Sequence, residues 1–586
     1  MTRTYINYFV APLVLSLLLL SGCGGQKVVA PINSDSKVKT ETNQEVEDLV
    51  ARAFDYMHRV DEFEPETIDK QINYFLSRWL DVNREAQKSW QPDDLLEKVS
   101  SQATALVSRK ELRRRHVTKE DIRYIKECVW LKTMASWAVE RAPKASSPKL
   151  VTAHKGEEAS QLIEAVRLFE WTMRNIQLIP LPKTPQTILG GNQEPRWRSR
   201  DGQGGPGYRF YPWQTIVRGQ GDEYERARVF MLLARQRGIT TVLLAKDATP
   251  EGVTVKKVQP WLPGVIIGNK IHLFDTKLGL PIPGKTDGSI ATLDELQSDP
   301  SLLQALNIGS TFSYRMSAAD LKKVVVLLNV SAQSMARRWH AIEANLAGKH
   351  KTVITQQPSR IVKRLKACKG KYVDLQYWQI PFENAFYRRR IDKSIRTNPG
   401  FARTYYIRFP VFRPGPIREA RLMHLSGKFE NTETKKKGAK ALYMDMRVSD
   451  KFAERLYSDT RVQRRLKVRR DPKFTDAQWR SAVLAYRVQL TKNKMRASYW
   501  IGLIHMESGN YKAAAKWLSV RLLDKYEITK QGDPCPWRVG ATYNYARALE
   551  AMGKFAEARN VLLRDETIGR HGSLVRARLL TKRIKQ

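Results

Sequence analysis

The 586-residue sequence predicts an α+β fold, and three observations support this class. An amphipathic helix pattern at residues 221–239 is followed at once by three strand-like segments joined by short turns. Helical periodicity fills residues 45–141, and two helix–turn–helix patterns centred on glycines lie near the C-terminus. We therefore expect a helical N-terminal region, a core of one helix and an antiparallel sheet, a mixed middle region, and C-terminal helical repeats.

The first 22 residues have the pattern of a secretory signal peptide. Their apolar run, residues 9–20, is too short to span a bilayer comfortably as a permanent helix. The run leads into L-S-G-C, which resembles the bacterial lipobox, and the resemblance implies cleavage before Cys23 and acylation of its sulfur. Residues 23–44 are polar and are expected to form a flexible tether. These features predict a lipid-anchored protein of a bacterial cell envelope, facing the periplasm or exposed at the surface; the alternative is a plain signal peptide with an incidental cysteine.

Residues 45–150 are predicted to be helical. Apolar residues recur at helical spacing from Val46 to Phe54 and again from Ile72 to Leu80. Thr118-x-x-Asp121 resembles a capping box at the start of a further helix. A segment rich in proline and serine at residues 142–150 then marks a linker.

The core is expected within residues 151–330. In the helix at 221–239, Ala227, Phe230, Met231 and Ala234 occupy one face. The strands are predicted at residues 240–246, 258–267 and 270–275, and only Gly268-Asn269 separates the last two, which is a strong hairpin signal. A further apolar strand is expected at 322–329, and a helix at 331–346.

The spacing within the core resembles the transglutaminase-like family. The family's helix motif is G-x-C-x-x-x-A, then an arginine eight residues on, then x-x-G-I. The matching residues are Gly221, Ala227, Arg235, Gly238 and Ile239. The resemblance covers roughly residues 160–300 and implies a helix packed on an antiparallel sheet.

The catalytic positions of the family are altered in this sequence. By the same spacing, Glu223 stands in place of the cysteine, Gln259 in place of the histidine, and Asp275 keeps the third position, with Trp261 completing the H-x-W strand motif. Glutamate cannot act as a thiol and glutamine cannot accept a proton, so the resemblance implies a degenerate triad. We expect Asp275 to accept a hydrogen bond at the strand end, and the amide of Gln259 to face the carboxylate of Glu223.

Residues 331–470 are predicted to be a mixed helix and strand region, and residues 471–586 resemble tetratricopeptide repeats. The repeat pattern lies at Gly502, Gly509, Ala514 and Leu518, and again at Ala546, Gly553, Ala558 and Leu562. The two central glycines are 44 residues apart, against the usual spacing of about 34. Such repeats present a groove to a protein or peptide partner. With two repeats, a helical cap that packs on its own protein is the alternative.

The net charge of +42 implies affinity for polyanions, such as an anionic envelope polymer, or a solvated basic surface. No nucleic-acid-binding signature accompanies the charge, so nucleic acid is not an expected partner. Cys128, Cys368 and Cys535 show no metal or disulfide spacing, and the nine histidines show none of the metal-binding spacings. We expect no cofactor and no metal.

These observations predict a lipid-anchored, catalytically inactive transglutaminase-like protein that acts as a binding scaffold. Two alternatives remain at this stage. One is an active hydrolase or acyltransferase that uses Glu223 and Asp275 as acid and base. The other is an envelope protein whose function is to bind polyanions.

Overall fold

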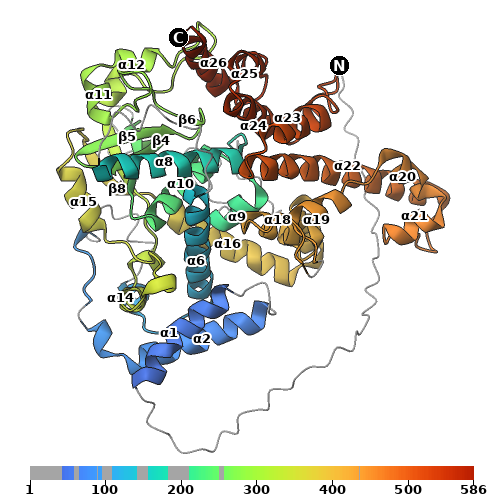
Figure 1. The fold of residues 1–586 in the computed structure, drawn as a ribbon. Helices are drawn as coiled ribbons and strands as arrows, with labels where there is room; N and C mark the ends of the chain where they lie inside the picture. Colours follow the sequence, from blue (N-terminus) through green and yellow to red (C-terminus); the bar gives the residue numbers. More distant parts are fainter. Residues whose placement is uncertain are drawn as a thin grey trace, which may run out of the picture.

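The computed structural model contains a six-stranded sheet with helices packed around and beside it (Figure 1). The structure describes residues 43–58, 65–88, 90–95, 109–140, 156–181, 210–249, 257–433 and 436–585. The signal peptide, Cys23, nearly all of the tether and the linker at 142–150 lie outside these residues. The predicted α+β class is confirmed.

The sheet has the strand order β6-β5-β4-β3-β7-β8. Neighbouring strands are antiparallel except for β7 and β8, which are parallel. The strands are β3 (Thr240–Asp247), β4 (Val258–Ile267), β5 (Lys270–Asp275), β6 (Leu280–Pro281), β7 (Val324–Leu328) and β8 (Asp374–Tyr377). Gly268 has a φ of 56° in the turn between β4 and β5, a conformation that glycine adopts readily. The four strands predicted from the sequence are therefore present, the last of them shorter than expected.

Helix α10 (Glu223–Gln236) packs on this sheet and is buried along almost its whole length. Strands β3 and β4 contact it on one side, and α6 (Lys119–Glu140), α8 (Gly156–Asn175) and α9 (Pro212–Arg218) contact it elsewhere. The rings of Phe169, Phe230 and Phe274 join α8, α10 and β5, with centroids 5.2–5.3 Å apart. This aromatic cluster fixes the helix against the sheet.

A small parallel sheet leads the chain into α10. Strand β1 (Gln177–Leu178) pairs with β2 (Gln220–Gly221). A Cβ at Gly221 would lie 3.0 Å from Thr215 Cγ2 and 3.1 Å from Ile176 Cγ2. A larger residue in place of this glycine would therefore force Thr215 and Ile176 to shift, because β2 is tightly enclosed just before the helix begins.

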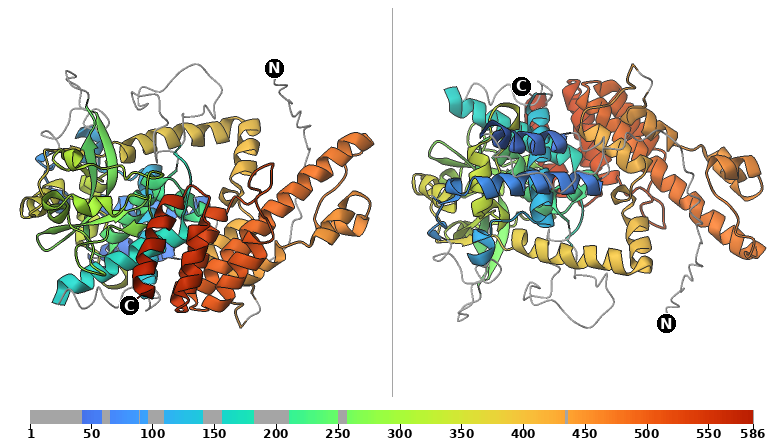
Figure 2. Two further views of the ribbon diagram at one scale, coloured as in Figure 1. Left: turned by 90° about the horizontal axis from the view of Figure 1, so that it is seen from above. Right: turned by 90° about the horizontal axis from the view of Figure 1, so that it is seen from below.

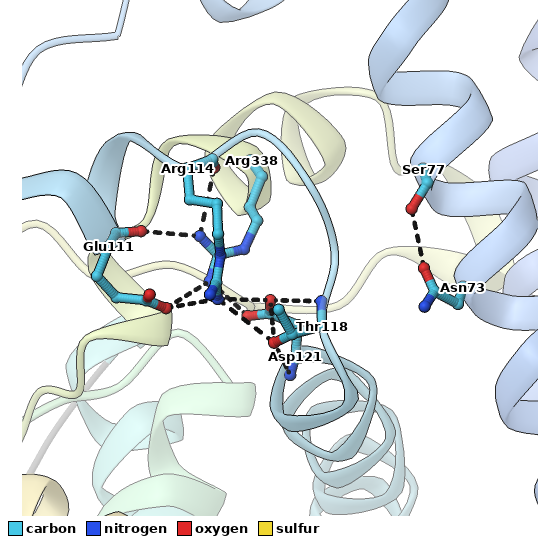
Figure 3. Close-up of polar contacts among 7 residues, drawn as sticks. All are labelled: Asn73, Ser77, Glu111, Arg114, Thr118, Asp121 and Arg338. Carbon is cyan, nitrogen blue, oxygen red and sulfur yellow. Dashed lines mark hydrogen bonds and ion pairs between the residues drawn. The ribbon is translucent and has the colours of Figure 1, made fainter.

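The N-terminal helices form a separate apolar cluster with α14. The cluster joins α1 (Asn43–His58), α2 (Pro65–Val82) and the first half of α6 to α14 (Arg337–Ala344), and η1 (Glu85–Gln87) and α5 (Arg109–Arg113) also contact α14. Arg338, which is fully buried, pairs with Asp121 at 2.5 Å and donates to the carbonyl of Glu111 at 3.1 Å (Figure 3). Asp121 also accepts from the backbone N–H of Thr118 at 2.9 Å. The predicted capping residues therefore also anchor α14 to the start of α6.

The middle of the chain is helical apart from the strands β7 and β8. Its elements are α11 (Leu293–Ser298), α12 (Ser301–Gln304), α13 (Ala318–Leu321), η3 (Gln333–Met335), η4 (Gly348–His350), α15 (Pro358–Lys366), α16 (Ile380–Thr397), α17 (Pro399–Arg408), η5 (Pro410–Phe412), α18 (Pro416–Leu425), α19 (Ala439–Asp445), α20 (Asp450–Glu454), η6 (Arg455–Tyr457) and α21 (Thr460–Arg465). The helix predicted at 331–346 is divided into η3 and α14. Within residues 331–470, β8 is the one strand in the described part of the chain.

The C-terminal region consists of successive antiparallel helices. They are α22 (Asp476–Glu507), α23 (Tyr511–Leu518), η7 (Ser519–Leu523), α24 (Arg538–Ala551), α25 (Phe555–Leu563) and α26 (Arg570–Ile584). Gly509 and Gly553, with φ of 72° and 75°, form the turns of the two predicted helix pairs. Helix α22 extends beyond the body of the protein and carries α20 and α21 near its outer end (Figures 1 and 2).

These C-terminal helices pack on the rest of the protein. One continuous apolar cluster runs from α6, α8 and α10 into α22 and α24, and includes Tyr499, Trp500 and Trp537. On α24, the amide of Asn544 donates to the carbonyl of Arg174 at 3.1 Å. The inner faces of these helices are therefore in contact with the rest of the same chain.

Candidate functional site

Glu223 begins α10, at the position where the resemblance places a cysteine. Asp222 caps the helix, because its Oδ1 accepts from the backbone N–H groups of Tyr224 at 3.0 Å and Glu225 at 2.8 Å. The hydroxyl of Thr276 donates to the carbonyl of Glu223 at 2.7 Å. The start of the helix is thereby held against the end of β5, and the Glu223 side chain is 6% exposed.

Asp275 ends β5 and is fully buried. Its Oδ1 accepts from the backbone N–H groups of Lys277 at 2.8 Å and Leu278 at 2.9 Å. Its Oδ2 accepts from the hydroxyl of Tyr314 at 2.7 Å, and that hydroxyl accepts from Trp261 Nε1 at 2.9 Å. Burial raises the pKa of Tyr314 well above its ordinary value, and the charge of Asp275 adds to this effect. Tyr314 therefore stays a hydrogen-bond donor to Asp275.

Arg315 joins the two acidic positions. Its Nη1 forms an ion pair with Glu223 Oε2, and its Nη2 lies 3.4 Å from Asp275 Oδ1 and 2.5 Å from the carbonyl oxygen of Trp261. The Arg315 side chain is 20% exposed. Burial disfavours its charge, but the pull of Asp275 and Glu223 outweighs this and raises the pKa of Arg315. We call Glu223, Trp261, Asp275, Tyr314 and Arg315 the bridged carboxylate cluster.

Gln259 lies outside the bridged carboxylate cluster. It is exposed on β4 and is opposite Lys246 in the ladder with β3. The register shifts at Trp261, which is the extra residue of a β-bulge, and a bulge changes the direction of the side chains on either side of it. The expected contact between Gln259 and Glu223 is not formed, since the Glu223 carboxylate pairs with Arg315 instead.

None of the three cysteines in the described part of the chain has a thiol with a lowered pKa. Burial raises the pKa of Cys128 to about 12 and that of Cys535 to about 11, and it also raises the pKa of Cys368. Cys128 lies beside Arg235, near the C-terminal end of α10, with Nη2 3.8 Å from its Sγ. A thiol of raised pKa is protonated at neutral pH and is a poor nucleophile.

Arg315 and Tyr314 are the site residues that the sequence did not reveal. They lie between α12 and α13, in a segment without helical or strand periodicity, and Arg315 is 40 residues from Asp275. The family motifs also include no residue from this segment. No local signal could have identified either residue.

Within the described residues, no group of three or more His, Cys, Asp or Glu side chains is arranged to hold a metal ion. The helices that the structure describes include none with the length and apolar character needed to cross a membrane. No family model matches the sequence, and neither the curated proteins nor the solved structures include a significant match.

Proposed function

We propose that this protein is a lipid-anchored component of a bacterial cell envelope whose transglutaminase-like core binds partners without catalysing a reaction. The observation that carries the proposal is the bridge of Arg315 between Glu223 and Asp275. This bridge occupies the place where the family resemblance puts a nucleophile and its supporting carboxylate.

The arrangement of α10 and the sheet supports the transglutaminase-like assignment. The chain runs from the helix into β3, β4 and β5, and Asp275 ends the third strand beside the start of the helix. Gly221, Ala227 and Arg235 keep the family spacing. The proposed family therefore rests on sequence spacing together with this contact.

The chemistry of the bridged carboxylate cluster argues against an acid–base role for its carboxylates. Asp275 already accepts hydrogen bonds from two backbone N–H groups and from Tyr314, and Arg315 lies beside both of its oxygens. A general base needs a lone pair directed at the substrate proton. Substrate would have to displace the guanidinium of Arg315 before either carboxylate could act.

Binding by the C-terminal helices is proposed to use their outer surfaces. The inner helices α22 and α24 contact α8 of the same chain through Glu507, Asn544 and Arg547. Arg547, for example, pairs with Glu170 of α8 at 2.7 Å. A peptide lying along these inner faces would have to replace contacts within the chain.

A second candidate function is the binding of an anionic envelope polymer. Residues 449–494, which we call the basic arm, contain 13 Lys and Arg against 5 Asp and Glu. The arm has its own small apolar core and projects from the body (Figure 2). Between residues 460 and 470, six of eleven residues are basic and none is acidic. Such a concentration of one charge attracts polyanions.

Two assays test these proposals on the purified mature protein. A thiol-directed probe and an amine-incorporation assay should both give no signal above a heat-denatured sample. Turnover that is abolished by changing Cys128, Cys368 or Cys535 would overturn the non-catalytic proposal.

Polyanion binding is tested by retention on an anionic polysaccharide column. A triple variant with Arg461→Gln, Arg464→Gln and Arg469→Gln should elute from this column at a lower salt concentration than the wild type. The matched control changes three exposed basic residues outside the arm, Lys393→Gln, Arg396→Gln and Arg403→Gln. Equal shifts for both triple variants would show that total charge, not the basic arm, governs retention.

A further inference from the structure

A cavity lies on a different side of α10 from the bridged carboxylate cluster. It has a volume of about 50 Å³ and is enclosed by α6, α10, the start of α16 and the segment that follows β7. The polar side chains at its wall include Arg123, Glu127, Tyr211, Arg228, Arg235 and Asn384. This volume has room for a few water molecules or for one small anionic group.

Arg228 is the unusual residue of this cavity. It is 8% exposed, and no described residue forms a hydrogen bond with its Nε or Nη1. The other two arginines at the wall have partners. Arg123 donates to the hydroxyl of Tyr211 at 2.9 Å, and Arg235 donates to Gln356 Oε1 at 2.9 Å. The guanidinium of Arg228 thus supplies donors that the protein itself does not use.

Glu127 acts on Arg228 through its charge but forms no ion pair with it. The carboxylate of Glu127 accepts from the backbone N–H of Trp213 at 3.1 Å. Burial lowers the pKa of Arg228 to about 10, so the side chain is still charged at neutral pH. A buried charge without a hydrogen-bonded partner destabilises a fold, so a ligand that pairs with the charge should stabilise it.

The start of α16 adds a second feature that favours an anion. Ile380 begins this 18-residue helix without a side-chain cap, and Pro381 and Asn384 from its first turns line the cavity. Pro381 has no N–H, and the N–H of Phe382 donates to the carbonyl of Gln379 at 3.0 Å, so this helix end contributes mainly the positive end of its dipole. The guanidinium of Arg228 and the positive end of the α16 dipole therefore both lie at the wall of this cavity.

We propose that this cavity is a binding site for a carboxylate group, with Arg228 as its principal donor. Arg123 is already paired with Asp392 at 3.3 Å, so Arg228 is the guanidinium at the wall that a single carboxylate would pair with. The planar fork of a guanidinium matches the two oxygens of a carboxylate. The site is separate from the bridged carboxylate cluster and does not depend on the proposed function.

The test measures thermal stability of the full-length mature protein during titration with sodium acetate, with sodium chloride used to hold ionic strength constant. The wild type should show a saturable rise in its thermal midpoint. In Arg228→Gln, the half-saturating concentration should rise about 10- to 100-fold, because a hydrogen bond to a charged group contributes about 1.5–3 kcal/mol. Without acetate, this variant should be at least as stable as the wild type, since it removes an unpaired buried charge. Arg403→Gln, an exposed change of the same type, should respond as the wild type does.

Two further probes identify the source of the carboxylate. N-acetylalanine mimics a peptide C-terminus, and a larger rise in the thermal midpoint with it than with acetate would indicate a peptide ligand. Inorganic phosphate should raise the midpoint less than either compound. If Arg228→Gln does not fold, Arg228→Lys replaces it, because lysine keeps the charge but loses the fork, and its half-saturating concentration should still rise about tenfold. An identical acetate response in the wild type and the Arg228 variant would overturn the proposal. A crystal structure in acetate with only water in the cavity would do the same.

Discussion

Replacing Arg315 with methionine tests whether the bridged carboxylate cluster holds α10 to the end of β5. Methionine keeps an unbranched, flexible chain but removes the guanidinium that pairs with Glu223 and lies beside Asp275. Breaking a buried ion pair by removing one partner costs about 3–5 kcal/mol. We expect the lower end, about 3 kcal/mol, because Arg315 is 20% exposed and Asp275 keeps hydrogen bonds from Tyr314 and from two backbone N–H groups.

A second change separates the ion pair from general packing. Glu223→Gln added to Arg315→Met removes one uncompensated carboxylate, so about 1–2 kcal/mol of the lost stability should return, a coupling typical of residues in contact. Hydrogen exchange followed by mass spectrometry over residues 223–236 and 275–281 measures the loss locally, which suits a chain too large for a single two-state transition. Gln259→Ala, at an exposed position on β4, is the control and should change stability by less than about 0.5 kcal/mol. An unchanged exchange rate in Arg315→Met, or no recovery in the double variant, would refute the reasoning.

Three further predictions concern other parts of the chain. Cys23→Ser should move the protein from the membrane fraction to the soluble fraction or block its processing, and wild-type fractionation and migration would contradict the anchor. Gly572→Ala should destabilise the docking of α26, since the new Cβ would lie 2.0 Å from the backbone oxygen of Leu278. Gly502→Ala should cost less, because its nearest neighbour at 2.8 Å is the mobile end of a leucine side chain; thermal midpoints in the opposite order would contradict this comparison. Burial lowers the pKa of His424 well below 6.5, so the unfolded chain binds a proton that the folded protein does not, and stability should fall as the pH drops below about 6.5, by up to about 1.4 kcal/mol per pH unit. His424→Asn should reduce this slope in unfolding measurements between pH 5 and 7, whereas a slope equal to that of the wild type would show that other groups cause it.

The sequence was sufficient to predict the helix and strands of the core. The apolar face of α10 and the Gly268-Asn269 turn are local patterns, and the strands at β3, β4 and β5 have the predicted positions within one residue. Residues 331–470 were predicted less well because their many aromatic residues are also common in strands. Tyr405, Phe409 and Phe412 instead pack together between helices, so tertiary packing determined the structure.

The sequence predicted the two carboxylates of the site but not the residues that contact them. Glu223 and Asp275 are close to one another as the spacing implied, because the end of β5 meets the start of α10. The contact with Gln259 was wrong because the bulge at Trp261 has no sequence signature. Arg315 was missed because a side chain contact across 40 residues leaves no periodic pattern.

The docking of the C-terminal helices restricts where a partner can bind. Gln177 of β1 donates to the carbonyl of Pro536 at 2.6 Å, and its Oε1 accepts from the backbone N–H of Gly540 at 3.0 Å. On α22, Glu507 accepts from Asn175 at 2.9 Å. These contacts satisfy buried polar groups, and a competing peptide would have to satisfy each of them again. The inner faces of the helices therefore stabilise this chain, and any partner recognised by the C-terminal region has to contact its outer faces or the basic arm.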